Sequence, residues 1–189
     1  MRWTELSHQT ARRWPRYWDL QQECQLRGKM FWTFLNGFSL FLPFQPRAGG
    51  ARLHAGCDLY FPKGTPIHAI ADGVVTRGPY PFYCGTFALE IDHGLFIARY
   101  GEIQSKTEAI AGAKVKAGQK IASVGHLVGI HVPSDMLHFE LYDKSLSGPL
   151  TVASDSGSAM MNGVPFMRRK DLIDPTLQLN QWRGNLPTA

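Results

Sequence analysis

The sequence predicts a mainly β domain for the middle of the chain. Runs rich in β-branched and aromatic residues recur between positions 66 and 142, and glycines separate them where turns need positive φ. Within one run the apolar residues Phe87, Leu89 and Ile91 alternate with Ala88 and Glu90. This period of two is typical of a half-buried strand.

A second alternating pattern covers residues 137–142. On an extended chain one face carries a polar row and the other an apolar row; the rows are His138, Glu140 and Tyr142 against Leu137, Phe139 and Leu141. Such a strand can hold a polar side chain rigidly over a core.

The remaining elements follow from turn and cap signals. We expect strands over 66–75, 86–92, 95–103, 120–124 and 137–142. Residues 145–158 are rich in Ser and Gly and predict a loop. Asp174 followed by Pro175 gives an N-cap and a proline at the first helical position, so a short helix to about Trp182 is expected.

The N-terminal fifty residues carry weaker signals. Residues 7–26 have aromatic side chains at helical spacing, and residues 30–44 are strongly apolar but interrupted at Asn36, Gly37 and Ser39. The uninterrupted part is shorter than the roughly 20 residues that span a bilayer, so no transmembrane span is expected. A buried element is favoured, and a signal-anchor remains an alternative.

Composition agrees with one folded domain plus extensions. The 189 residues are 44% hydrophobic and 19% charged, with a net charge of +5. Basic residues are scattered and accompany no nucleic-acid motif, which argues against a nucleic-acid partner. Attraction to an anionic cell envelope and simple solubility both explain the charge.

Three residues form a candidate metal site. His54, Asp58 and His138 supply two imidazoles and one carboxylate, a set that suits catalytic zinc (Zn2+) and leaves a position open for water. His54 and Asp58 are four positions apart, so on an extended chain they share a face.

An ordered series of motifs accompanies these residues. It comprises His54-x-Gly56-x-Asp58, Gly64-Thr65-Pro66-Ile67-x-Ala69, Ala71-x-Gly73-x-Val75, Ile91-Asp92-His93-Gly94, Tyr100, Val115-x-Ala117-Gly118-Gln119-x-Ile121, Val124-Gly125 and Leu137-His138-Phe139-Glu140. The series resembles the lysostaphin-type (LytM) zinc metallopeptidases that cut peptidoglycan cross-links. The resemblance implies an antiparallel β-sheet domain over 50–143 that binds zinc through His54, Asp58 and His138. It leaves 1–49 as an N-terminal extension that packs on this core, and 144–189 as a loop with a C-terminal capping helix.

The sequence departs from that family where catalysis is expected. Glu102 stands where the Tyr-x-His-Leu segment has its histidine, and Met136 replaces the first member of the His-x-His pair. One hypothesis is an active peptidoglycan endopeptidase in which Glu102 is the base. His126 or His131 then supplies a second polar group, and Tyr100 helps to hold the oxyanion.

The alternative is a degenerate member that binds peptidoglycan or regulates another hydrolase. The retained ligand set favours activity, because nothing maintains an idle metal site.

Cys57 neighbours Asp58 and therefore points to the opposite face, away from a metal. A buried free thiol and a Cys57–Cys84 disulfide both stay open, with Cys24 left over.

The variant motifs also resemble the effector-type branch of the family. Together with the absence of an ordinary signal peptide, this resemblance predicts a protein secreted or delivered to the periplasm by a type VI secretion machine or a phage lysis system. The implied partners are the peptidoglycan substrate, an immunity protein and a component of the secretion machine.

Overall fold

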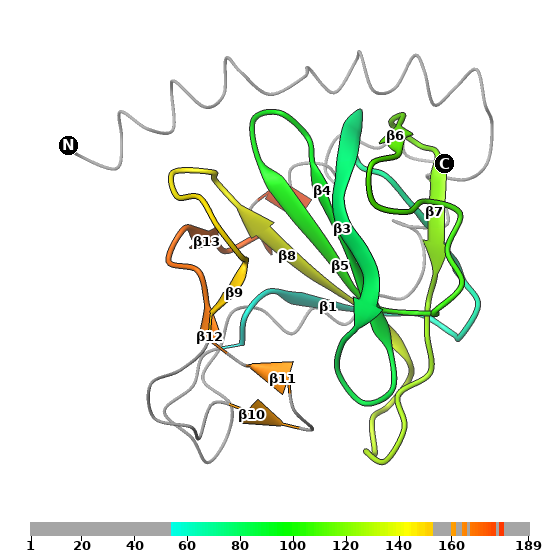
Figure 1. Cartoon of the computed structure of the whole chain (residues 1–189). Helices are drawn as coiled ribbons and strands as arrows, with labels where there is room; N and C mark the ends of the chain where they lie inside the picture. The colour runs from blue at the N-terminus through cyan, green and yellow to red at the C-terminus, as the bar shows by residue number, and fades with distance from the viewer. Residues whose placement is uncertain (1–53, 153–159, 162–163, 166, 177, 180–189) are drawn as a thin grey trace.

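The computed structural model describes residues 54–152, 160–161, 164–165, 167–176 and 178–179. The predictions for 1–49, including Cys24, lie outside these residues. A seven-stranded antiparallel sheet forms the centre of the described part, in the order β1-β8-β5-β4-β3-β6, with β13 also paired to β8 (Figure 1). Its strands are β1 (Cys57–Tyr60), β3 (Gly73–Pro81), β4 (Phe87–Asp92), β5 (Ile97–Ile103), β6 (Lys114–Val115), β8 (Met136–Tyr142) and β13 (Leu172–Ile173). The expectation of a mainly β, antiparallel fold is confirmed.

Three two-stranded pairings accompany the large sheet. They join β2 (Pro66–His68) to β7 (Lys120–Ser123), β9 (Thr151–Val152) to β12 (Met167–Arg168), and β10 (Met160–Met161) to β11 (Val164–Pro165). The strand expected over 66–75 is therefore two strands in different sheets. The chain turns between them, where the backbone of Ala69 is hydrogen-bonded to Gly118 and Gln119 instead of to the large sheet.

One face of the large sheet covers the main hydrophobic core. On β8 the residues that point into this core are Leu137, Phe139 and Leu141, all almost fully buried. Tyr100 and Ile103 of β5 join the same core. We call this side of the sheet the core face, and the opposite side, which carries His138, Glu140 and Tyr142, the metal face. The alternation predicted for 137–142 is confirmed.

The metal face is also buried over much of its area. Arg99 and Glu140 are each 0% exposed, and Glu90 is 6% exposed. Phe82, at the end of the β3–β4 hairpin, and Arg168 of β12 lie over this part of the face. The expectation that strand 86–92 is half-buried is therefore wrong, because side chains that follow and precede it in sequence cover its second face as well.

Residues beyond 143 do more than the predicted loop and cap. Strand β13 pairs with β8 directly, and β12 brings Arg168 to the metal face. The predicted N-cap is confirmed, since Thr176 N donates to Asp174 Oδ1 at 2.8 Å and Leu179 N donates to Pro175 O. Thr176, Gln178 and Leu179 are helical, and the expected continuation to Trp182 lies outside the described residues.

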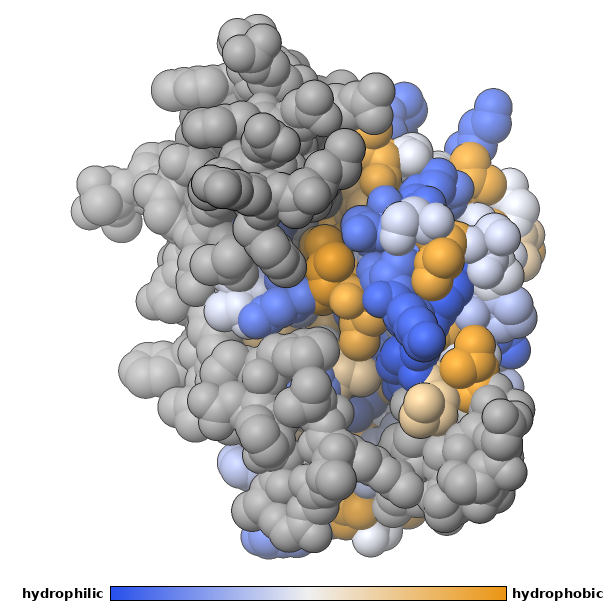
Figure 2. Space-filling model, turned by 90° about the vertical axis from the view of Figure 1, so that its left-hand side faces the viewer, coloured by the Kyte–Doolittle hydropathy of each residue, from blue (hydrophilic) through white to orange (hydrophobic). Residues whose placement is uncertain are grey.

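The described surface mixes polar and apolar side chains (Figure 2). Its exposed large apolar residues are Val74, Leu95, Ile110, Val128, Leu146, Val152 and Met167. Single exposed apolar side chains are ordinary on folded domains and do not mark an interface. Among the described residues, no helix has the length and hydropathy needed to cross a membrane.

Candidate metal centre

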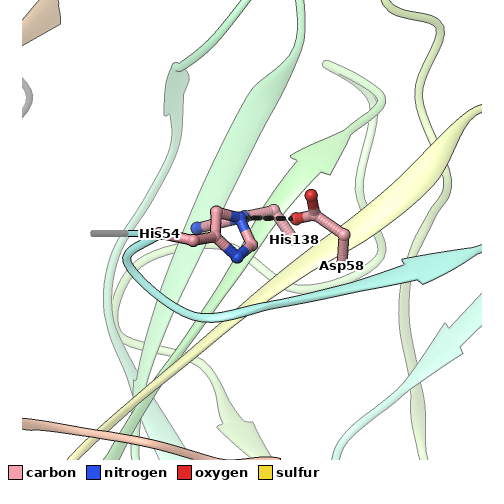
Figure 3. A group of neighbouring side chains, drawn as sticks. All are labelled: His54, Asp58 and His138. Atoms are coloured by element: carbon pink, nitrogen blue, oxygen red, sulfur yellow. Dashed lines mark hydrogen bonds and ion pairs between the residues drawn. The ribbon is translucent and has the colours of Figure 1, made fainter. Parts of the chain in front are cut away.

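Strand pairing brings the three predicted ligands together. Asp58 on β1 lies directly opposite His138 on β8 in the antiparallel register. His54 lies three positions before the first residue of β1, and its ring lies beside that of His138 with centroids 5.1 Å apart. The three donor atoms all lie within 4.8 Å of one another (Figure 3).

Gly56 allows the chain between His54 and Asp58 to pass close to β8. It has a φ of 147°, and a Cβ at this position would lie 2.4 Å from the carbonyl oxygen of Phe139. Any other residue would push β1 away from β8, since no side chain can shift to relieve a clash with backbone. The spacing His-x-Gly-x-Asp therefore has a local steric cause.

The donor atoms converge on one carboxylate oxygen. Asp58 Oδ1 is 3.1 Å from His54 Nε2 and 2.8 Å from His138 Nδ1. All three side chains are about nine-tenths buried. Two imidazole nitrogens and a carboxylate oxygen facing a common point form a donor set that fits zinc, with room in its coordination for a further ligand.

The electrostatics of the trio are strongly coupled. Burial alone would raise the pKa of Asp58, but hydrogen bonds with His138 and His54 hold it well below its usual range. Burial alone would lower the pKa of His138, but Asp58 and Glu140 raise it to about 10. A cation at Nδ1 would take the place of the proton beside Asp58, while Glu140 accepts from Nε2, so the surroundings of His138 favour positive charge.

The second nitrogen of His138 is also held. Its Nε2 lies 3.0 Å from Glu140 Oε1, which leaves Nδ1 directed at Asp58. A carboxylate on the outer nitrogen of a histidine ligand fixes the orientation of the ring. Glu140 therefore supports the site, a role that its place in the polar row did not reveal.

A β-bulge brings Glu102 to the metal face. Between the pairs Leu89–Tyr100 and Phe87–Ile103, β4 has one residue and β5 has two, Gly101 and Glu102. Glu102 has a φ of 61° and is 7% exposed. Since Tyr100 and Ile103 both point to the core, the two intervening residues lie on the other side. Gly101 is paired with His138, so Glu102 follows a residue directly opposite a candidate metal ligand.

Met136, the second altered position, belongs to a separate apolar cluster. This apolar cluster consists of the buried residues Cys84, Leu127 and Met136 with the partly buried Tyr60, Tyr83, Ile130 and Val132. Met136 is 4% exposed and lies on the same face of β8 as His138. Burial raises the pKa of the Cys84 thiol, and the negative charge of Glu102 adds to the effect, which places Cys84 near Glu102.

The two loop histidines differ in their surroundings. His126 Nδ1 lies 3.1 Å from Asp135 Oδ1, and the imidazole is 59% exposed. Leu127 N also donates to Asp135, so the carboxylate ties the loop to the start of β8. His131 is exposed.

Tyr100 lies away from the ligand trio. It is fully buried on the core face, where its hydroxyl accepts a hydrogen bond from Ile70 N and contacts His93 Nε2 at 3.2 Å. Burial raises the pKa of this phenol. These contacts give Tyr100 a role in holding the core together, on the opposite side of the sheet from His138.

The cysteines do not form the disulfide that the sequence left open. Cys57 and Cys84 are both free and buried. Cys57 packs in the main core, whereas Cys84 packs in the apolar cluster with Met136 on the metal face. Burial, followed by the charge of Asp58, raises the pKa of Cys57 to about 12, so this thiol stays protonated. The prediction that Cys57 points away from the metal site is confirmed.

Residues 52–148 match the sequence model of peptidase family M23. The chain belongs to peptidase family M23. This match covers the three candidate ligands, Glu102 and Met136, and it ends before β9 and β12.

Two curated relatives support the assignment. The chain is 33% identical over 95 residues to the peptidoglycan DD-endopeptidase ShyC of Vibrio cholerae, covering 50% of this chain and 21% of that protein. It is 30% identical over 164 residues to an uncharacterized metalloprotease of Haemophilus influenzae, covering 84% of this chain and 34% of that protein. The chain thus spans about a fifth and a third of these relatives.

Solved structures agree on the fold. LytU superimposes with a TM-score of 0.54 at 26% identity, covering 76% of this chain and 86% of that chain. Lysostaphin gives the same TM-score at 22% identity, covering 82% of this chain and 56% of that chain, and shows the fold alone. The M23 match and these two structures together establish a lysostaphin-like β fold for this chain.

Proposed function

We propose that this chain is a zinc-dependent peptidoglycan endopeptidase, which hydrolyses peptide bonds in stem peptides or cross-links. The observation that carries the proposal is the convergence of His54 Nε2, Asp58 Oδ1 and His138 Nδ1 on one point, beside a face that also carries Glu102. Peptidoglycan is the substrate class because a relative with 33% identity is a peptidoglycan DD-endopeptidase.

A zinc ion held by the trio would polarise the scissile carbonyl and lower the pKa of the attacking water. Glu102 would act as the base that takes a proton from this water as the oxygen attacks the carbonyl carbon. As the carbon–nitrogen bond breaks, the same carboxyl would give the proton to the leaving amine. The buried carboxylate of Glu102 suits this task, because the bulge in the backbone of β5 directs it to the metal face.

His126 is the better of the two loop candidates for a second polar group. Asp135 holds its Nδ1, which leaves Nε2 available to a substrate oxygen. No carboxylate partner of this kind is seen for His131 among the described residues. Tyr100 has no place in the proposed chemistry because it lies on the core face.

The apolar cluster favours a second candidate function. Met136 cannot donate or accept a proton, and Cys84 and Leu127 pack around it at the position where the lysostaphin-type pattern has the first histidine of its His-x-His pair. A member with this arrangement and an intact metal site would bind peptidoglycan, or regulate another hydrolase, without cutting it.

Digestion of purified peptidoglycan, with and without chelator, separates these functions. The enzyme releases peptide fragments with new amino ends that mass spectrometry detects, and the chelator stops their release. A binding module sediments with peptidoglycan and releases no fragments at any zinc concentration. A third kind of protein, for which zinc is only structural, unfolds on chelation and neither binds nor cuts.

We further propose that the protein acts outside the cytoplasmic membrane, as an antibacterial effector or a lysis-type hydrolase neutralised by an immunity protein. Peptidoglycan lies there, so the substrate class supports the compartment. Expression in a Gram-negative host, with and without a periplasmic targeting sequence, tests this proposal. Lysis only in the targeted form supports it, and growth of both cultures contradicts it.

A further inference from the structure

We propose that Arg168 is a positioning residue of the metal centre, which acts through Glu140 to hold His138 in the orientation that binds zinc. The inference rests on the proposed function only in taking His138 as a zinc ligand. Arg168 lies on β12, outside the residues that match the M23 family.

A continuous series of buried contacts joins Arg168 to the ligand trio. Arg168 Nε donates to Glu140 Oε1 at 2.7 Å. The same carboxylate oxygen lies 3.0 Å from His138 Nε2, and His138 Nδ1 lies 2.8 Å from Asp58. Glu140 is 0% exposed and the Arg168 side chain is 10% exposed, so water cannot readily replace either partner.

Arg168 reaches His138 by a second path. Its guanidinium carbon lies 5.7 Å from the centre of the Phe82 ring, and that ring lies 5.9 Å from the His138 ring. Phe82 also covers Gly101, where a Cβ would come within 2.7 Å of its Cε1. Arg168 thus holds both the carboxylate and the aromatic ring that confine the imidazole.

The two oxygens of Glu140 have separate partners. Oε2 accepts from Arg99 Nη1 at 2.7 Å and from the Tyr142 hydroxyl, whereas Oε1 accepts from Arg168 and faces His138. Without Arg168, Glu140 keeps its ion pair with Arg99 at Oε2 but loses the donor at Oε1, the oxygen that orients His138. Loss of a partner that contacts the ligand itself typically weakens metal binding about 10- to 100-fold, and Arg168 acts one contact further out, so its loss should fall at the lower end of this range.

Arg169 provides a matched control in the same segment. It is 6% exposed and makes an ion pair with Asp171 through Nε and Nη2. Its Nη1 donates to the carbonyl of Gly148. Arg169 is therefore a buried, paired arginine beside Arg168. Its guanidinium carbon lies 5.6 Å from the centre of the Tyr142 ring, but the Tyr142 hydroxyl donates to Glu140 Oε2 and not to the oxygen that faces His138.

The experiment compares zinc affinity in the full chain carrying Arg168→Met, Arg168→Lys or Arg169→Met. Affinity is measured by competition with a chromophoric chelator, at a temperature where circular dichroism shows each variant folded. We expect Arg168→Met to weaken zinc binding about tenfold, and Arg168→Lys to recover most of that loss because it keeps a charged donor. Arg169→Met should bind zinc like the wild type even where its melting temperature falls.

Substitution of cobalt(II) for zinc adds a measurement that does not depend on the stability of the fold. The visible absorption of bound cobalt reports ligand geometry, so Arg168→Met should shift or broaden the bands while Arg169→Met leaves them unchanged. Equal zinc affinity in Arg168→Met and the wild type, or an equal loss in both methionine variants, overturns the inference and leaves the proposed function standing. A wild-type chain that binds no zinc overturns the proposed function and this inference together.

Discussion

The metal face of β8 has two ends with opposite chemistry. At one end His138, Glu140 and Tyr142 take part in a hydrogen-bonded polar network with Asp58, Arg99 and Arg168. At the other end, two residues before His138, Met136 packs against Cys84 and Leu127 in an apolar cluster. Both ends are buried to a similar degree, so exposure does not explain the difference.

The comparison separates metal binding from proton transfer. A buried ion network is retained only where each charge has its partner, because removal of one member leaves another charge buried and unpaired. The ligand end has this property, so its residues are mutually dependent. Met136 has no charged partner within its apolar cluster, so an apolar side chain at this position leaves no member of the cluster charged and unpaired. Under the proposed mechanism, proton transfer falls to Glu102 on the neighbouring strand.

The largest effect should come from breaking the ligand end. His138→Gln removes a donor atom from the trio, and the loss of zinc affinity should exceed the roughly 100-fold that loss of an outer partner causes. Peptidoglycan cleavage should disappear with the metal. Metal content after dialysis measures the first effect, with His126→Gln as the control that keeps its zinc. One tightly held zinc in His138→Gln would remove His138 from the ligand set.

The next effect tests the apolar end. Met136→His places a polar ring among Cys84, Leu127 and Met136's other apolar neighbours, and should lower the free energy of unfolding by about 1–3 kcal/mol. Met136→Leu conserves volume and should cost less than about 1.5 kcal/mol. Urea unfolding of the zinc-loaded variants compares the two. If the histidine variant is as stable as the leucine variant, this end of the face is open to water and the contrast with the ligand end is lost.

The smallest effect should come from the loop. His126→Asn should lower the cleavage rate about tenfold or less without changing zinc content, because the loop histidine assists and does not replace the base. His131→Asn is the matched control and should leave the rate unchanged. Initial rates on purified peptidoglycan measure both. Equal rates for the two variants would exclude His126 from the reaction.

Sequence patterns anticipated much of the fold and the ligand trio for definable reasons. Period-two alternation fixed which residues of 137–142 share a face, and the same rule placed Cys57 away from Asp58. His54 and Asp58 are four positions apart, so the same rule placed both candidate ligands on one face.

The parts that sequence reasoning missed depend on irregular backbone or distant pairing. Strict alternation would place Glu102 on the core face with Tyr100, and only the bulge at 101–102 reverses this. No local pattern marks Arg168 as a partner of Glu140, because the two residues are 28 positions apart in the sequence.

The most direct test of the account is Glu102→Gln, with zinc content and peptidoglycan cleavage measured on the same preparation. The amide has the size of the carboxylate but cannot take the proton. The account predicts wild-type zinc content and a cleavage rate lower by about 10²- to 10⁴-fold. A variant that binds zinc and cuts at the wild-type rate would show that Glu102 is not the base.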